Sequence, residues 1–142
     1  MVGVDRDIGP ARANVAGLGV TLIEADLEAG GPFPFPRDAF DGVVVTNYLW
    51  RAILPAIVAS VASDGVLIYE TFALGNEVYG RPSNPAFLLR PGELLQATAG
   101  QLCVIAFEHG RLAKPDRVVQ RIMAVGFAHP WASGSGPVLP TV

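Results

Sequence analysis

The feature that most constrains the fold is a run of β-branched residues that stops abruptly at polar side chains. Val43, Val44 and Val45 follow one another without a break, and Thr46, Asn47 and Tyr48 come directly after them. Such a run is typical of a parallel strand that is buried on both faces because helices cover the sheet. Ligands of open α/β sheets bind outside the carboxyl ends of the strands, so residues 46–48 are the first candidates for a site. The alternative for Asn47 is that it caps the next helix.

Composition places the chain among globular proteins. Of its residues, 51% are hydrophobic and only 16% are charged, which is typical of a folded chain. Its length of 142 residues is enough for one domain with a single core. Its apolar runs fall short of the about 18 residues that cross a bilayer, and residues 1–5 lack the basic region and long apolar core of a secretory signal. We therefore expect a cytoplasmic protein without a membrane partner.

Charge and metal-ligand patterns argue against two other classes of function. The formal net charge is −3 and no cluster of Lys and Arg occurs, which argues against a nucleic-acid surface. Cys103, the single cysteine, lies in an apolar run and is expected to be a small buried hydrophobe. Neither His109 nor His129 has a second ligand at metal spacing, so no metal site is predicted.

Hydrophobic periodicity and turn residues predict alternating strands and helices. The predicted strands are Met1–Val4, Val20–Ile23, Asp41–Thr46, Val66–Phe72, Leu102–Phe107 and Val118–Phe127. The predicted helices are Pro10–Ala16, a segment from Pro55 that ends at Ser63-Asp64-Gly65, and Pro91–Gly100. The middle helix rests on an apolar stripe at helical spacing, which consists of Trp50, Ile53, Leu54, Ile57, Val58 and Val61.

The connections complete the predicted α/β domain, which spans residues 1–127. The last two strands are joined through Gly110 and residues 114–116, a connection short enough to require an antiparallel pair. Residues 74–90 form a long loop rich in Gly, Asn and Pro, and loops of this length are usually functional or disordered. Residues 128–142 carry Gly, Ser and Pro without periodicity and are predicted to be a disordered tail.

This order of elements resembles the class I S-adenosylmethionine-dependent methyltransferase fold. The most specific part of the resemblance consists of Asn47-Tyr48-Leu49, residues 69–73 and residues 75–85. The sequence of these segments is similar to that of bacterial methyltransferases of the tellurite-resistance type. The resemblance implies a Rossmann-like three-layer sandwich with a mostly parallel sheet and a C-terminal antiparallel hairpin. It also implies methyl transfer from S-adenosylmethionine to an unidentified acceptor, expected to be a small molecule.

The resemblance assigns cofactor-binding roles to five residues. Asp5 would accept hydrogen bonds from the two ribose hydroxyls, Asp26 would meet the adenine amino group, and Leu27 would lie against the adenine face. Asn47 and Tyr48 would lie near the methionine part of the cofactor and the transferred methyl, where their role is positioning. The alternative for Asp5 and Asp26 is ordinary turn or cap chemistry.

The substrate side would be formed by the segment that begins at Glu70. Tyr48 and Glu70 are the catalytic candidates, with Glu70 acting as a base or holding a cationic group; the alternative is an ion pair with Arg81 or Arg90. Tyr79 and Arg81 are candidates for the acceptor pocket, the alternative being that they only order the loop. Glu93 is expected to be a favourable first-turn charge of its helix.

One departure from the family leaves other interpretations open. The first strand, its helix and the Gly-rich turn that normally precede the strand ending in Asp5 are absent from this sequence, and we expect two strand edges to face the gap. One alternative is a non-catalytic remnant that acts as a binding or dimerisation module, pairing with a second copy through these edges. The other is an NAD-binding Rossmann fragment, although its G-x-G-x-x-G turn is also absent.

Overall fold

The computed structural model describes residues 1–136, in which the strands pair into two separate sheets. The chain divides into two compact units, Met1–Pro34 and Phe35–Val142. One sheet belongs to each unit, and each unit is described by itself.

The first unit contains a parallel pair of strands and one short helix. Strand β1 (Val2–Asp5) pairs with β2 (Thr21–Glu24), so that Asp5 lies opposite Glu24. Helix α1 (Gly9–Arg12) is one turn long and ends before the predicted Ala16. The Asn14 side chain donates to the Pro10 carbonyl at 3.3 Å, a local bond of the kind that competes with helix continuation.

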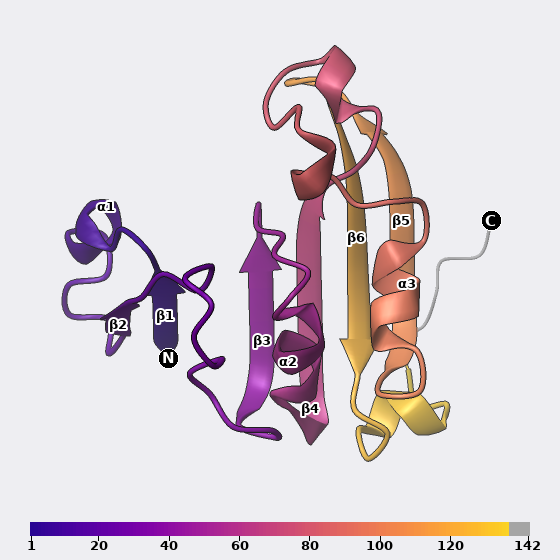
Figure 1. Cartoon of the computed structure of the whole chain (residues 1–142). Helices are drawn as coiled ribbons and strands as arrows, with labels where there is room; N and C mark the ends of the chain where they lie inside the picture. The colour runs from indigo at the N-terminus through magenta and orange to yellow at the C-terminus, as the bar shows by residue number, and fades with distance from the viewer. Residues whose placement is uncertain (137–142) are drawn as a thin grey trace. The chain divides into compact units, whose positions relative to one another are not determined.

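The second unit contains a mixed four-stranded sheet (Figure 1). Its strands are β3 (Phe40–Thr46), β4 (Val61–Phe72), β5 (Cys103–Leu112) and β6 (Arg117–Val125), in the spatial order β3-β4-β6-β5. The β3 and β4 strands are parallel, whereas β6 is antiparallel to both of its neighbours. The predicted C-terminal hairpin is therefore present, but this sheet is not mostly parallel.

Helices cover one face of this sheet. Helix α2 (Leu54–Ala59) packs on β4, and α3 (Glu93–Thr98) packs on β5 and β6 (Figure 1). The side chains buried under them belong to both layers: Leu54, Ile57, Leu67, Tyr69, Leu94, Ile122 and Ala124. The other face of the sheet carries Val44, which is 69% exposed, and Ile68, which is 45% exposed.

Within this unit the described residues thus form two layers, and the predicted burial of the valine run on both faces is wrong. The reason lies in the alternation of a strand, which turns successive side chains to opposite faces. Val43 and Val45 are partly buried, whereas Val44 points to the face that neither α2 nor α3 covers. The β-branched run identified the strand correctly. It does not show how many layers cover the sheet.

The junction between α2 and β4 corrects a second prediction. Val61 was expected on the helical stripe, but it is the first residue of β4, and residues 63–65 lie within that strand instead of in a turn. The register explains both differences from the prediction. One residue of β3 lies between Phe40 and Gly42, whereas four residues of β4 lie between their partners Val61 and Val66. Residues 62–65 therefore bulge out of the ladder.

The loops contain short helical turns. Two 3-10 helices, Asn76–Val78 and Pro85–Phe87, interrupt the long loop after β4. Gly110, which was predicted in a turn, pairs with Val119 inside the hairpin, so the turn itself is shorter. A further 3-10 helix, Pro130–Ser133, lies where a disordered tail was predicted to begin. Residues 137–142 of that predicted tail lie outside the described residues.

Two neighbouring leucines of α3 test the one-sided packing. Leu94 is 1% exposed and Leu95 is 38% exposed. We expect Leu94→Ala to lower the free energy of unfolding by about 2–5 kcal/mol, because it leaves a cavity under the helix. Leu95→Ala is the matched control and should cost less than about 1 kcal/mol. Urea denaturation of both variants measures the difference, and equal losses would contradict the assignment of the buried face.

Candidate functional site

The carboxyl ends of β3 and β4 lie side by side because the two strands are parallel. Thr46 pairs with Glu70, and the Asn47 N–H donates to the Glu70 carbonyl at 3.0 Å, immediately beyond β3. Asn47 has φ 53°, a left-handed conformation in which Asn is several-fold enriched among non-glycine residues. It does not cap the following helix, because the N-cap of α2 is Ile53. The capping alternative is therefore excluded.

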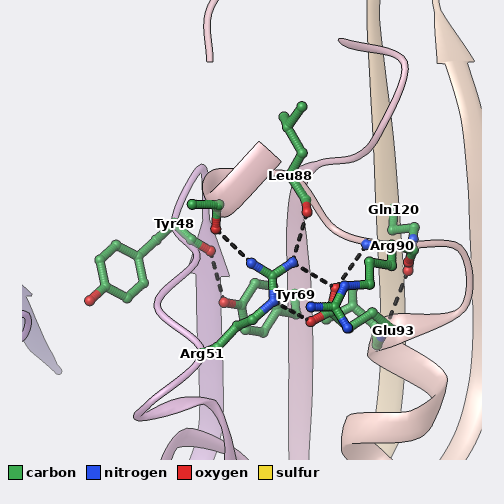
Figure 2. A network of polar contacts seen from close by, with 9 residues as sticks. Tyr48, Arg51, Tyr69, Leu88, Arg90, Glu93 and Gln120 are labelled. Atoms are coloured by element: carbon green, nitrogen blue, oxygen red, sulfur yellow. Dashed lines mark hydrogen bonds and ion pairs between the residues drawn. The ribbon is translucent and has the colours of Figure 1, made fainter. Parts of the chain in front are cut away.

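Tyr48 is held by its backbone. Its carbonyl accepts a hydrogen bond of 2.8 Å from the hydroxyl of Tyr69, a fully buried residue of β4. Burial raises the pKa of the Tyr69 hydroxyl well above its ordinary value, so this group stays protonated and remains a donor. Figure 2 shows the Tyr48 ring pointing away from the neighbouring charged groups. The segment after β3 is thus fixed through its main chain.

Arg51 connects this segment to the loop after β4 (Figure 2). Its guanidinium forms a bidentate pair with the Glu93 carboxylate, with Nε–Oε1 at 2.6 Å and Nη2–Oε2 at 2.9 Å. It also donates to the carbonyls of Ala86 at 2.6 Å and Leu88 at 2.8 Å. Four donor interactions therefore come from one planar group, which a lysine could not reproduce.

The Glu93 carboxylate accepts three hydrogen bonds, two from Arg51 and one from the Arg90 N–H. Burial disfavours its charged form, but the hydrogen bonds from Arg51 and from the Arg90 N–H, together with the charge of Arg51, outweigh burial and lower the pKa of the carboxyl. Gln120 of β6 supports the same turn, because its amide donates to the Arg90 carbonyl and accepts from the Leu94 N–H. The first-turn position predicted for Glu93 is correct, and the contacts show a wider structural role.

Glu70 takes part in an ion pair, but with a different partner from those expected. Arg121, which lies opposite Glu70 on β6, approaches its carboxylate at 3.6 Å and also pairs with Glu108 of β5. The expected partners Arg81 and Arg90 are further along the chain in the exposed loop. Strand register explains the difference, since residues directly opposite on adjacent strands are the nearest neighbours.

The loop that carries Tyr79 and Arg81 is anchored to β6 by a buried amide. Asn76 is 1% exposed; it donates to the Pro82 carbonyl at 3.0 Å and accepts from the Val118 N–H at 3.1 Å. Tyr79 is 42% exposed, and the Arg111 guanidinium lies 5.0 Å from its ring centroid. Arg81 is exposed. These contacts order the loop and leave both candidate side chains at the surface.

The candidates Asp5, Asp26 and Leu27 belong to the first unit. Asp5 accepts the Asp7 N–H at 2.9 Å, and Asp26 accepts the Glu28 N–H at 2.9 Å, so both carboxylates perform the turn chemistry given as their alternative. Both aspartates are exposed and Leu27 is half-buried. The second unit alone brings together Asn47, Tyr48 and Glu70.

Three residues of this region were missed at the sequence level: Arg51, Asn76 and Gln120. Each acts on a partner about 26–42 positions away along the chain or on a loop backbone, and no local pattern signals such pairs. Among residues 1–136, no group of three or more His, Cys, Asp and Glu side chains is placed to hold a metal ion. In the same part of the chain, no helix has both the length and the apolar character needed to span a membrane.

Comparison with solved structures relates the fold to methyltransferases. The N-methyltransferase NodS from Bradyrhizobium japonicum matches with a TM-score of 0.63 and 13% identity, over 88% of this chain and 72% of that chain. An S-adenosylmethionine-dependent methyltransferase from Mesorhizobium loti matches with a TM-score of 0.60 and 18% identity, over 87% and 79%.

A third similar structure contains a bound product of the cofactor. It is the 1,6-didemethyltoxoflavin-N1-methyltransferase from Burkholderia thailandensis with 1,6-didemethyltoxoflavin and S-adenosylhomocysteine, at a TM-score of 0.59 and 18% identity, over 88% of this chain and 60% of that chain. No family model and no curated protein sequence matches the chain. At these identities the comparisons show the fold, which is the α/β Rossmann-like fold of methyltransferases.

The lowered pKa of Glu93 predicts a pH-dependent stability difference. The folded state keeps this carboxyl ionised at a pH where the unfolded state protonates it, so its contribution is complete above the ordinary glutamate pKa of about 4.3 and disappears as the pH falls through the lower folded value. Glu93→Gln should therefore cost about 1–3 kcal/mol of unfolding free energy at pH 7. The gap to the wild type should shrink below pH 4, as measured by urea denaturation from pH 7 to 3. A gap independent of pH would contradict the ion pair.

Proposed function

We propose that the chain binds S-adenosylmethionine and transfers its methyl group to a small-molecule acceptor. The observation that carries this proposal is Asn47 in a left-handed conformation at the carboxyl end of β3, hydrogen-bonded to the end of β4. Non-glycine residues in left-handed conformations cluster at functional sites, and ligands of open α/β sheets bind at the carboxyl ends of the strands. The likeness to methyltransferase structures supports the same activity. The sequence of residues 47–49 and 75–85 supports a methyltransferase similar to the tellurite-resistance type.

Each unit carries its own set of proposed cofactor contacts. Asp5 would accept the ribose hydroxyls, while Asp26 and Leu27 would hold the adenine. The chemistry of the carboxylates fits this role, because each has about four acceptor positions and its backbone turn uses one. Asn47 and Tyr48 would orient the methionine end of the ligand.

The acceptor would be aligned on the side of Glu70. S-adenosylmethionine supplies an already activated methyl group when bound, so the protein mainly orients the acceptor and excludes water. Glu70, kept near Arg121, would take a proton from the acceptor or hold a cationic group, while Tyr48 would position the reacting atom. Tyr79 and Arg81 would contact the rest of the acceptor from the loop.

Titration calorimetry with S-adenosylhomocysteine tests this function. We expect Asp5→Ala to weaken binding by about tenfold or more, because the ribose hydroxyls lose a charged acceptor. Asp7→Ala is a matched control, since Asp7 accepts the Gly9 N–H at 3.0 Å in a similar turn and should leave affinity nearly unchanged. Titration with NAD separates the dinucleotide-binding alternative. A folded chain that binds neither ligand would contradict the proposal.

A second candidate function is a dimerisation module. The observation that favours it is the exposed apolar face of the second sheet, where Val44 and Ile68 lie in register on β3 and β4. Among the described residues β3 has β4 as its partner strand, so its other edge offers backbone donors and acceptors to a second copy. This function would need no cofactor.

Sedimentation equilibrium distinguishes the dimer from a monomer. If β3 pairs with a second copy, the wild-type chain should form a dimer, and Val44→Lys should shift it to a monomer because a lysine on the shared apolar face remains solvated. Lys114, exposed on the hairpin turn, offers the control Lys114→Ala, which should not change the association. A wild type that stays monomeric at high micromolar concentration would exclude this function.

A further inference from the structure

We propose that Arg51 is a positioning residue that holds two segments of the candidate site, residues 47–50 and 85–90, in one fixed arrangement. The segments follow β3 and β4 and are separated by more than 30 residues of chain. The proposal rests on the proposed function, because Asn47 and Tyr48 would contact the cofactor and residues 85–90 belong to the loop that carries the acceptor candidates Tyr79 and Arg81. The arrangement itself is a property of the protein that can be measured without either ligand.

Arg51 projects from a segment whose backbone is fixed. It lies three residues after Tyr48, in the turn that leads from β3 to α2, where the Ile53 N–H donates to the Trp50 carbonyl. The Tyr48 carbonyl is fixed to Tyr69 at 2.8 Å. Arg51 therefore extends from a segment whose backbone is already held at two points.

The partners of the Arg51 guanidinium lie in the loop after β4 and at the start of α3. Two of the four hydrogen bonds of the guanidinium go to the main-chain carbonyls of Ala86 and Leu88, so they fix the path of the loop whatever its side chains do. The other two go to Glu93, which orients the guanidinium plane. A simple ion pair would not need the two carbonyls, and their presence indicates a role in placing the loop (Figure 2).

The turn that carries Glu93, the partner of the Arg51 guanidinium, is itself held in place. Gln120, 0% exposed on β6, bonds to both Arg90 and Leu94, and the Glu93 carboxylate accepts the Arg90 N–H at 2.8 Å. The side chain of Arg51 is only 31% exposed, so water competes weakly for its donors. Movement of the loop away from Tyr48 would break several of these bonds together.

Residue-resolved amide exchange in Arg51→Lys tests the proposal, because lysine keeps the charge and loses the planar fork. We expect the amides of Leu88 and Leu89 and that of Asn47 to exchange about tenfold faster, with Ile122 of β6 unchanged. Affinity for S-adenosylhomocysteine should fall about three- to tenfold. Arg37→Lys, at an exposed position, is the control and should change none of these quantities.

A charge swap separates positioning from a simple ion pair. In the double variant Arg51→Glu, Glu93→Arg the pair can form again, but a carboxylate would face the carbonyls of Ala86 and Leu88. We expect exchange to remain fast, and recovery to wild-type rates would overturn the proposal. If Arg51→Lys does not fold, Glu93→Gln provides the same readout, since it removes the charge that orients the guanidinium.

The remaining outcomes are also decisive. Unchanged exchange at Leu88 and Leu89 would show that Arg51 does not hold the loop, and faster exchange there without a change at Asn47 would show that the two segments are not coupled. Either result overturns the proposal. A wild-type chain that binds no S-adenosylhomocysteine would reject the proposed function, while the exchange rates would still decide the role of Arg51.

Discussion

The parallel pairing of β3 and β4 is the constraint on which the candidate site depends. It aligns Val45 with Tyr69 and Thr46 with Glu70. The segments that follow β3 and β4 therefore leave the sheet at the same end, the carboxyl end of the two strands. The buried hydroxyl of Tyr69 can then reach the Tyr48 carbonyl, and Arg51 can reach the loop that follows β4. A one-residue slip would turn every side chain of β3 to the opposite face and remove these contacts.

Local sequence patterns predicted much of this framework. The valine run located β3, and the short connection after β5 required the antiparallel hairpin. Ser63-Asp64-Gly65, which was predicted to end the helix, lies instead in a bulge within β4. The covering of the sheet was not predictable in the same way. Alternation is masked over residues 43–45 because all three are valine, so the exposed position of Val44 carries no signal.

The candidate site was predictable only at positions next to strand ends. Asn47 and Glu70 were found because they end apolar runs, and the left-handed conformation of Asn47 fits a residue that tolerates it. The partner of Glu70 was predicted wrongly, because Arg121 becomes its neighbour only through the pairing of β4 with β6. Arg51 and Gln120 were missed for the same reason, since their partners are defined by the tertiary structure.

A titration of the isotope-labelled chain with S-adenosylhomocysteine, followed by NMR, tests the central claim most directly. If the residues at the carboxyl ends of β3 and β4 form a cofactor site, saturable shifts should appear at the amides of Asn47 and Tyr48. The amides at the far end of the sheet, such as Val66, should not shift. Shifts confined to other regions, or none at saturating ligand, would contradict the assignment of this edge as a cofactor site.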